Sequence, residues 1–369
     1  MPVDRRSIVA VLHALIMAGG GGTRFWPRSR QRLPKQFLQF TGDRSLLQQA
    51  FDRIEALVPS ERVWVITTAL QRPVVLEQLP GLPEGQVIAE PCGRDTAACI
   101  GVGAALIAAR EPNAVMVAMP SDHVIEPAQE FRRTVLGALT LAEEHPDALI
   151  TFGISPTFPA TGYGYIQRGP ELPGRQGVSA YRIQAFREKP DGETAERYLH
   201  SGQFAWNSGV FVWKARTLLE TLRERQPPLH AAISRIAAAW PTDQRESVFR
   251  REFEPLSRLS IDRAVMEGCA SGIVLQAPFR WDDVGSWQAI ERMNPQDADG
   301  NTVLATHCGL QTKNCLIVGD PDRLIASASV ENLLIVQDRD ATLVADKRDE
   351  VAIKKLVEML KAKGLERFL

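Results

Sequence analysis

Residues 14–40 have the sequence ALIMAGGGGTRFWPRSRQRLPKQFLQF, and the rest of the chain is organised around them. The apolar run Ala14–Ala18 predicts a buried strand, and four glycines, Gly19–Gly22, follow it directly. Successive glycines let backbone N–H groups approach an anion, because no Cβ stands in the way. Arg24 and Lys35 add donors that suit phosphate oxygens. The stretch therefore predicts a strand that ends in a polyphosphate-binding loop.

Two common nucleotide-binding patterns do not match this loop. The pattern G-x-G-x-x-G fails, because counting from Gly19 its last position is Arg24. The P-loop ending G-K-[ST] fails as well, because Thr23 and Arg24 follow the glycines. A glycine loop after a strand is also typical of a tight turn. The basic residues that follow, Arg24 and further arginines at 28, 30 and 32, favour a local anion site over that alternative.

The order of the remaining patterns predicts an α/β fold. From residue 45 to residue 153, apolar runs typical of strands alternate with segments of helical periodicity. This alternation predicts a Rossmann-like, mostly parallel mixed sheet flanked by helices. One long helix is expected at Leu218–Ala239. The residues before the first strand predict a short N-terminal extension (1–12). The composition becomes loop-like at Asp297–Asn301, which predicts a boundary between a main domain (13–297) and a small β-rich C-terminal domain (298–369) that ends in a helix.

The charge and the apolar runs bear on partners and location. A net charge of −1 gives no field that would attract nucleic acid or an anionic membrane, so we expect neither as a partner. Arg5-Arg6 followed by Ile8–Ala18 resembles a secretory leader, but cleavage after Ala18 would remove the strand before the glycine loop. No other run approaches the roughly 20 apolar residues of a membrane span. We therefore predict a cytoplasmic protein.

Two aspartates follow apolar strands of the expected sheet. Asp122 comes directly after the strand at Ala114–Met119, and Asp283 follows the strand at Ile273–Ala277 in the sequence WDDVG. Ligands of such sheets bind beyond the carboxyl ends of the strands. Two carboxylates together with substrate phosphates form a Mg²⁺ site, because this ion prefers oxygen ligands. Taken singly, each aspartate is as typical of a turn or a helix cap.

The motifs together resemble those of a known family. MAGGGGTRFWPRSR followed by PKQF is similar to the signature of the sugar-nucleotide pyrophosphorylases, and most similar to their mannose-1-phosphate guanylyltransferase branch. The similarity extends over nearly the whole chain, through the segments Glu90–Ala97, Pro120–His123, Thr161–Gln167, Glu188–Pro190, Trp206–Gly209 and Trp281–Trp287. The resemblance implies Mg²⁺-dependent transfer of GMP from GTP to mannose 1-phosphate, giving GDP-mannose and pyrophosphate.

The resemblance also implies roles for individual residues. Those expected to be catalytic are Arg24, Lys35, Asp122, Lys189 and Asp283, of which Asp122 and Asp283 would hold the metal. Those expected to bind the nucleotide are Ala18, Gly19, Gly20, Gly22, Thr23, Arg24, Lys35, Glu90, Arg94, Thr96 and Asp122. Those expected to bind the sugar phosphate are Gly162, Glu188, Lys189 and Asn207. On sequence alone, Lys189 also fits a surface turn and Asn207 the entry turn of a strand.

Three further expectations remain. Asp95 stands where the family usually has asparagine, so it either faces a guanine N–H or weakens a turn. A pyrophosphorylase for another pair of hexose 1-phosphate and nucleoside triphosphate therefore stays open as an alternative. Some relatives carry an added cupin-type isomerase domain. The residues after 297 are too few for one, so we expect no isomerase activity. The apolar side of the C-terminal helix suggests a homodimer. A non-catalytic regulatory homologue is the alternative from another functional class.

Overall fold

The computed structural model describes residues 11–40 and 42–369, which form two compact units. Most of the predicted extension 1–12 lies outside the described residues. Unit 1 contains the described residues up to Gly19, with Ala50–Ser121 and Ile125–Trp281; unit 2 contains Gly20–Gln49, Asp122–Val124 and Asp282–Leu369. The units do not correspond to a single cut in the sequence, and the predicted boundary after residue 297 stays a prediction.

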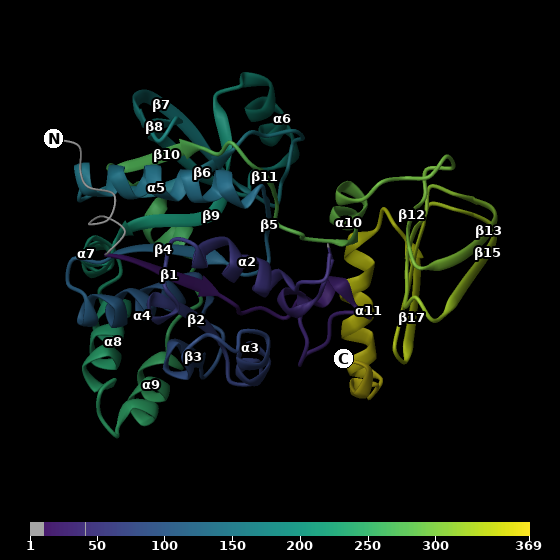
Figure 1. Cartoon of the computed structure of the whole chain (residues 1–369), viewed down its shortest axis with the longest axis horizontal. Coiled ribbons are helices and arrows are strands. Elements are labelled where there is room, and N and C mark those ends of the chain that lie inside the picture. Colours follow the sequence, from purple (N-terminus) through teal and green to yellow (C-terminus); the bar gives the residue numbers. More distant parts are fainter. Residues whose placement is uncertain (1–10, 41) are drawn as a thin grey trace. The chain divides into compact units, whose positions relative to one another are not determined.

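Unit 1 is built on a nine-stranded sheet with the strand order β3-β2-β1-β4-β9-β6-β10-β8-β7 (Figure 1). The strands are β1 (Leu12–Met17), β2 (Val63–Thr68), β3 (Val87–Glu90), β4 (Val115–Pro120), β6 (Leu149–Ile154), β7 (Gly164–Arg175), β8 (Val178–Glu188), β9 (Phe204–Lys214) and β10 (Gly272–Gln276). Strands β8 and β9 run opposite to the others, which are parallel in direction. The predicted Rossmann-like, mostly parallel mixed sheet is confirmed.

Helices cover both faces of this sheet, which explains why β1 and β4 are apolar along nearly their whole length. On one face Leu15 packs against α4, where a Cβ on Gly103 would lie 2.6 Å from the Leu15 side chain. On the other face Phe131 of α5 contacts Phe152 of β6. The helices of this unit are α3 (Arg72–Gln78), α4 (Asp95–Arg110), α5 (Ala128–Glu144), α6 (Gly192–Ser201), α7 (Ala215–Arg225), α8 (Pro227–Ala239), α9 (Arg245–Phe253) and the π-helical turn η5 (Asp262–Met266). Helix α2 (Leu46–Glu55), with short 3-10 turns at Ser60–Arg62 and Glu84–Gln86, completes the connections.

The single helix predicted at Leu218–Ala239 is wrong. The structure has two helices, α7 and α8, which meet at Gln226. Pro227 and Pro228 cannot continue α7, because a proline lacks the N–H that a helix interior needs, but proline is favoured in the first turn of a new helix. Among the described residues, no helix combines the length and the apolar character of a membrane span.

Unit 2 holds the glycine loop together with the C-terminal segment. Its short turns η1 (Thr23–Phe25) and η2 (Lys35–Phe37) and its helix α10 (Trp287–Met293) share a core in which the Phe25 ring lies 4.8 Å from Phe40 and 5.2 Å from Trp287. The C-terminal strands are β12 (Thr302–Leu304), β13 (Thr306–Lys313), β14 (Leu316–Val318), β15 (Leu324–Glu331), β16 (Leu333–Asp338) and β17 (Ala341–Asp346). Helix α11 (Glu350–Ala362) and a 3-10 turn at Glu366–Phe368 end the chain, which confirms the predicted β-rich segment with a terminal helix. The strands β5 (Val124–Glu126) and β11 (Arg280–Asp282) each lie where the chain passes from one unit to the other, and further passages follow Gly19, Gln49 and Ser121.

Candidate active site

The glycine loop of unit 2 packs directly on Lys35. A Cβ on Gly22 would lie 2.7 Å from the backbone nitrogen of Lys35, closer than real Cβ contacts come. Gly22 also has a φ of 52°, and Gly20 has a φ of 105°, both in the region that favours glycine. Glycine at these two positions therefore lets the loop turn and lie against η2. In unit 1, the Ala18 backbone nitrogen donates to the Ile66 carbonyl at 2.7 Å, while Gly19 is exposed.

Lys35 connects the segments that carry the two predicted metal-binding aspartates. Its Nζ lies 2.8 Å from Oδ2 of Asp122 and donates to the carbonyl oxygens of Asp283 and Val284 at 2.7 and 3.0 Å. Burial of the Asp122 carboxyl would raise its pKa, but Lys35 and His123 together hold that pKa below its usual value. The structure thus brings Lys35, Asp122 and Asp283 together, with Asp122 ionised at neutral pH.

The turn after Asp283 is strained. Val284 has a φ of 49°, which is unusual for a β-branched residue, and its side chain is fully buried. The Gly285 nitrogen donates to Asp283 Oδ1 at 3.1 Å, and Nη1 of the exposed Arg24 donates to the Gly285 carbonyl at 3.3 Å. This conformation points the Asp283 and Val284 carbonyls at Lys35 and the next carbonyl at Arg24.

The neighbouring carboxylate, Asp282, supports this turn. Its Oδ1 accepts from the Val284 nitrogen at 2.8 Å, and its Oδ2 pairs with Arg292 at 2.8 Å. Both oxygens of Asp282 are therefore used within the fold. Among the described residues, no cluster of three or more His, Cys, Asp or Glu side chains is arranged to hold a metal ion.

Two arginines of the basic stretch, Arg28 and Arg30, have partners in the C-terminal segment of unit 2. Arg28 donates to the Gly319 carbonyl, and Arg30 donates to the Pro27 and Phe368 carbonyls and pairs with Asp340 at 2.8 Å. These two arginines therefore attach the loop to the C-terminal segment of unit 2. Arg24, the residue of this stretch that is predicted to bind the nucleotide, instead contacts the turn after Asp283.

The residues predicted to bind the sugar phosphate lie in unit 1, at the ends of neighbouring strands. Glu188 ends β8, and its Oε1 lies 3.1 Å from Nζ of Lys189, which has a φ of 45°. A Cβ on Gly164 would lie 2.9 Å from Glu188 Oε2, so glycine there lets the carboxylate cross β7. Gly162 lies in the preceding loop, and a Cβ there would have open space around it.

Asn207 in β9 is held from both ends of its amide. Its Nδ2 donates to Asp262 Oδ1 at 2.8 Å, and its Oδ1 lies 2.8 Å from the Thr151 hydroxyl. Burial, followed by the negative charge of Glu188, raises the pKa of Asp262 to about 7. Sequence reasoning missed Asp262. Its one local feature, an acidic residue opening a helical turn, is shared by many aspartates without any function.

The predicted nucleotide ligands Glu90, Arg94 and Thr96 lie at the end of β3 and just after it. Glu90 is 7% exposed, and its Oε1 has no hydrogen-bond partner among the described residues. Burial raises the pKa of Glu90 to about 8, although a hydrogen bond with the Cys99 thiol works in the opposite direction. Glu90 is therefore a buried carboxyl with an unused acceptor.

The structure explains the aspartate at position 95. Asp95 has a φ of 67°, in the left-handed region that asparagine and aspartate tolerate better than most residues. Its Oδ1 accepts from the Thr96 nitrogen at 2.7 Å at the start of α4. Aspartate fits this turn as asparagine would, so the local bond supports neither a weakened turn nor a role in base recognition.

Arg94 and Thr96 both contact the segment that leads to Asp262. The Arg94 guanidinium donates to the Glu254 carbonyl, with Nε at 2.9 Å, and the Thr96 hydroxyl accepts from the Ile261 nitrogen at 2.8 Å. Both predicted nucleotide ligands thus have structural partners in the described chain. Thr23, in the glycine loop of unit 2, is exposed.

Glu90→Gln is expected to change how stability depends on pH. The folded protein holds the Glu90 proton up to a pH of about 8, whereas the ordinary value for this carboxyl is 4.5. Folding is therefore penalised as the pH rises above 4.5, and the penalty grows until about pH 8. The amide removes this penalty, so the free energy of unfolding of the variant should exceed that of the wild type by on the order of 4 kcal/mol at pH 8.5 and by little at pH 5. Urea unfolding at both pH values measures this, and parallel pH profiles of the two proteins would contradict it.

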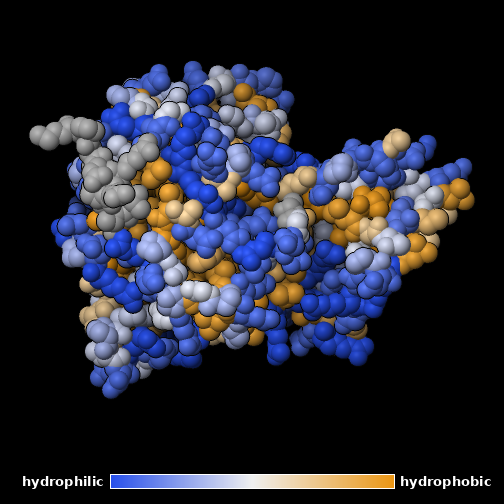
Figure 2. Space-filling view, in the orientation of Figure 1, coloured by the Kyte–Doolittle hydropathy of each residue, from blue (hydrophilic) through white to orange (hydrophobic). Residues whose placement is uncertain are grey.

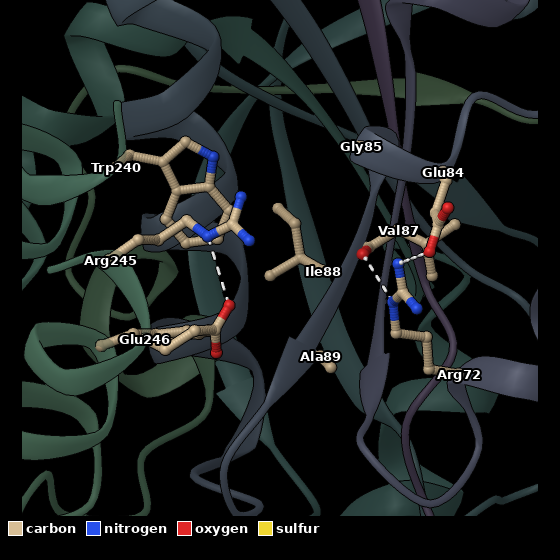
Figure 3. A pocket seen from close by; sticks show the side chains of 10 residues that line it. Arg72, Glu84, Gly85, Val87, Ile88, Ala89, Trp240, Arg245 and Glu246 are labelled. Atoms are coloured by element: carbon tan, nitrogen blue, oxygen red, sulfur yellow. Dashed lines mark hydrogen bonds and ion pairs between the residues drawn. The ribbon is translucent and has the colours of Figure 1, made fainter. Parts of the chain in front are cut away.

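A separate pocket lies elsewhere in unit 1, at the outer edge of the sheet (Figure 3). Ile88 of β3 lies between Arg72 and Glu84 on one side and Trp240, Arg245 and Glu246 on the other. The volume of the pocket is about 510 Å³. Arg72 pairs with Glu84 at 2.8 Å and Arg245 with Glu246 at 3.2 Å, so its charges are balanced. None of the predicted site residues lines this pocket.

Comparisons with known proteins match two successive parts of the chain. The nucleotidyl transferase family model matches residues 13–300, and a model described as MannoseP isomerase/GMP-like beta-helix domain matches residues 305–360. The chain is 38% identical over 360 residues to "Mannose-1-phosphate guanylyltransferase 2" of Escherichia coli O157:H7, and 38% identical over 359 residues to "Mannose-1-phosphate guanylyltransferase" of Escherichia coli strain K12. These alignments cover 95% and 96% of this chain and 74% of each relative. A crystal structure of "mannose-1-phosphate geranyltransferase" from Thermus thermophilus has a TM-score of 0.83 and 34% identity, over 95% of this chain and 99% of that one.

Proposed function

The chain belongs to the nucleotidyl transferase family, and from this premise we propose that it transfers GMP from GTP to α-D-mannose 1-phosphate. The products are GDP-mannose and pyrophosphate. Relatives named mannose-1-phosphate guanylyltransferase align with nearly the whole chain, which supports this reaction. The observation that carries the proposal within the structure is Lys35, which joins the segments of Asp122 and Asp283 under the glycine loop.

In the reaction, an oxygen of mannose 1-phosphate attacks the α-phosphorus of GTP in line. The bond from that phosphorus to the bridging oxygen breaks, and pyrophosphate leaves with the electron pair. Both reactants are anions, so the protein must neutralise charge and align them, and it need not supply a nucleophile. Arg24 and Lys35 are proposed to bind the triphosphate and the pyrophosphate, with backbone N–H groups of the glycine loop as further donors.

Asp122 and Asp283 are proposed to hold Mg²⁺ together with the phosphates. Two carboxylates with phosphate and water oxygens suit this ion, and Asp122 is ionised at neutral pH. When bound, Mg²⁺ supplies positive charge that stabilises the negative charge developing on the phosphate oxygens. Lys35 fixes the direction of the Asp122 carboxylate, and the strained turn fixes that of Asp283.

The sugar phosphate is proposed to bind to the group at the ends of β8 and β9. Lys189 is exposed and suits the phosphate, whereas Glu188 accepts from sugar hydroxyls. Asn207 can donate its second N–H to a hydroxyl. Glu90 is proposed to accept from the N–H groups of guanine, because its buried Oε1 lacks a partner among the described residues. A buried acceptor of this kind discriminates strongly against a base that has no matching donor.

Pyrophosphate release from the pure protein with Mg²⁺ tests this function. The assay compares GTP, ATP, UTP and dTTP, each with mannose 1-phosphate and with glucose 1-phosphate. Release should be fastest with GTP and mannose 1-phosphate. Faster release with another pair would contradict the proposed substrates and keep the reaction type, and a folded protein that is silent with every pair would contradict the enzyme and favour a regulatory homologue. The cytoplasmic location, and the expectation of neither nucleic acid nor a membrane as partner, stay predictions.

We propose a homodimer that forms through an exposed apolar surface, and not through the apolar side of the C-terminal helix as the sequence suggested. Ile353 and Val357 of α11 are buried in the core of unit 2, so the apolar side of this helix is used within the chain. Figure 2 instead shows apolar surface over the part of the chain that holds β13 and β15. There Leu310 and Leu324 are 67% and 61% exposed.

We expect Leu310→Glu with Leu324→Glu to convert a dimer into a monomer. A charge at each position cannot be buried in an apolar interface without a large desolvation cost. Light scattering should give the mass of two 40.8 kDa chains for the wild type and of one for the variant. Val351→Glu, at an equally exposed position on α11, is the matched control and should stay dimeric. A monomeric wild type would contradict the proposal.

A further inference from the structure

Asp262 is a carboxylate that the proposed mechanism does not use, although it lies among the sugar-binding residues. Its Oδ1 accepts from Asn207 Nδ2 at 2.8 Å. On the other side of the same amide, Asn207 Oδ1 lies 2.8 Å from the Thr151 hydroxyl and 3.4 Å from the Gly209 nitrogen. These contacts fix the plane of the Asn207 amide. Its Nδ2 carries a second N–H, which has no acceptor among the described residues.

The segment that carries Asp262 is itself fixed to the start of α4. The Ala97 nitrogen donates to the Leu259 carbonyl at 3.0 Å, and the Ile261 nitrogen donates to the Thr96 hydroxyl at 2.8 Å. Asp262 then opens the turn η5, where the Glu267 nitrogen donates to the Asp262 carbonyl at 2.8 Å. The Asp262 backbone therefore has little freedom, and its carboxylate is a rigid acceptor for Asn207.

Burial and the charges around Asp262 disfavour the ionised form of its carboxyl in the folded protein. Glu188 and Asp95 are both negative and raise its pKa, Lys189 lowers it, and burial makes the largest contribution. An aspartate with these neighbours penalises folding as the pH rises above its ordinary pKa of 3.8, and the penalty grows until about pH 7. A buried carboxyl whose pKa is raised in this way is typical of functional sites.

We propose that Asp262 is a positioning residue for the sugar: it orients the Asn207 amide so that the second N–H of Asn207 meets a hydroxyl of the hexose 1-phosphate. The inference rests on the proposed function, because it takes Asn207 as a sugar contact. Asp262 acts through Asn207 and does not touch the reacting atoms. Loss of a contact that is equally strong in the ground state and the transition state raises KM and leaves kcat unchanged.

The test compares Asp262→Ala with Asp262→Asn in steady-state kinetics at pH 8, with the substrate pair that the wild-type protein uses fastest. Asp262→Ala should raise KM for the sugar phosphate about tenfold and leave kcat and KM for the nucleotide within about twofold. Asp262→Asn keeps an oxygen at the Oδ1 position and should restore KM to within about threefold of wild type. Arg263→Ala, at the exposed next residue of the same turn, is the control and should not change KM.

A double-variant cycle separates this role from a purely structural one. In an Asn207→Ala background, adding Asp262→Ala should produce no further rise in KM, because the residue through which Asp262 acts is gone. An unchanged KM in Asp262→Ala, an equal rise in the KM of the nucleotide, or additive effects in the double variant would overturn the inference. An inactive wild-type protein would contradict the proposed function, whereas an active wild type with an unaffected Asp262→Ala would overturn this inference alone. Removing a carboxyl whose pKa is raised by folding is not expected to unfold the protein at pH 8, and a melting curve of each variant checks this.

Discussion

Asp122→Asn and Asp283→Asn should each lower kcat for pyrophosphate release by at least about a thousandfold, while the protein stays folded. Each variant keeps the shape of the side chain and removes one negative charge from the group around Lys35. Two anionic substrates can approach one another only if positive charge is held between them, and these carboxylates are proposed to hold it as Mg²⁺. Initial rates over a range of Mg²⁺ concentrations measure the effect, and the Mg²⁺ required for half-maximal rate should rise in both variants.

Asp282→Asn is the matched control for this prediction. Asp282 is adjacent to Asp283, but both of its oxygens have partners within the fold, the Val284 nitrogen and Arg292. The amide oxygen of asparagine can still accept from Val284, so the turn should persist and kcat should stay within about tenfold of wild type. Near-normal rates in both Asp122→Asn and Asp283→Asn would contradict the metal assignment, as would an equal loss in Asp282→Asn.

Lys35→Met should lower kcat by about 10³–10⁴-fold and also destabilise unit 2 by about 3 kcal/mol. Nζ of Lys35 neutralises Asp122 and donates to two backbone carbonyls, and its side chain is only 10% exposed. Methionine fills the same volume but leaves the Asp122 carboxylate without its cation and the two carbonyls without their donor. Pyrophosphate release and urea unfolding measure the two losses separately.

Two further variants sharpen this second prediction. Lys35→Arg keeps the charge but should not restore kcat, because Gly22 packs on the backbone and Cβ of Lys35 and a planar guanidinium cannot make the same three contacts. Arg32→Met, at an exposed residue of the same basic stretch, should leave both rate and stability unchanged. An active Lys35→Met protein would show that the triphosphate is bound elsewhere.

The first strand and the glycine loop after it could be predicted from the sequence because their signals are local. An apolar run followed by glycines predicts a strand that ends in a tight loop at Ala18–Gly22. The structure has the strand β1 and, after it, a loop in which Gly20 and Gly22 have positive φ. Asp122 and Asp283 follow strand-like runs for the same reason, and both lie around Lys35. The family resemblance then selected Asp283 over Asp282, a choice for which local periodicity has no signal.

Features that depend on distant parts of the chain could not be predicted in this way. Arg28 and Arg30 belong to the same basic stretch as Arg24, yet their partners are Gly319 and Asp340, about 300 residues later in the sequence. The role proposed for Asp262 depends on Asn207, which lies in β9, 55 residues earlier in the sequence. No pattern within a window of ten or twenty residues contains either pairing.

The split between α7 and α8 is a different kind of miss. Pro227 and Pro228 carry the signal for a helix break, but the apolar periodicity on both sides of them resembles one continuous helix. Asp95 is a case in which the sequence directed attention to the wrong property. From the family pattern, the aspartate was considered for a role in base recognition. The structure gives it a φ of 67°, so the position favours a residue that tolerates the left-handed region.

Following the label from radioactive GTP into its products tests the central claim most directly. The protein is incubated with Mg²⁺, mannose 1-phosphate and GTP that carries ³²P at either the α- or the γ-phosphate, and the products are separated. The proposed reaction places the α-label in GDP-mannose and the γ-label in pyrophosphate, in equal amounts. An α-label that stays in GDP or GMP, or a γ-label that appears in the sugar phosphate, would contradict nucleotidyl transfer by this protein.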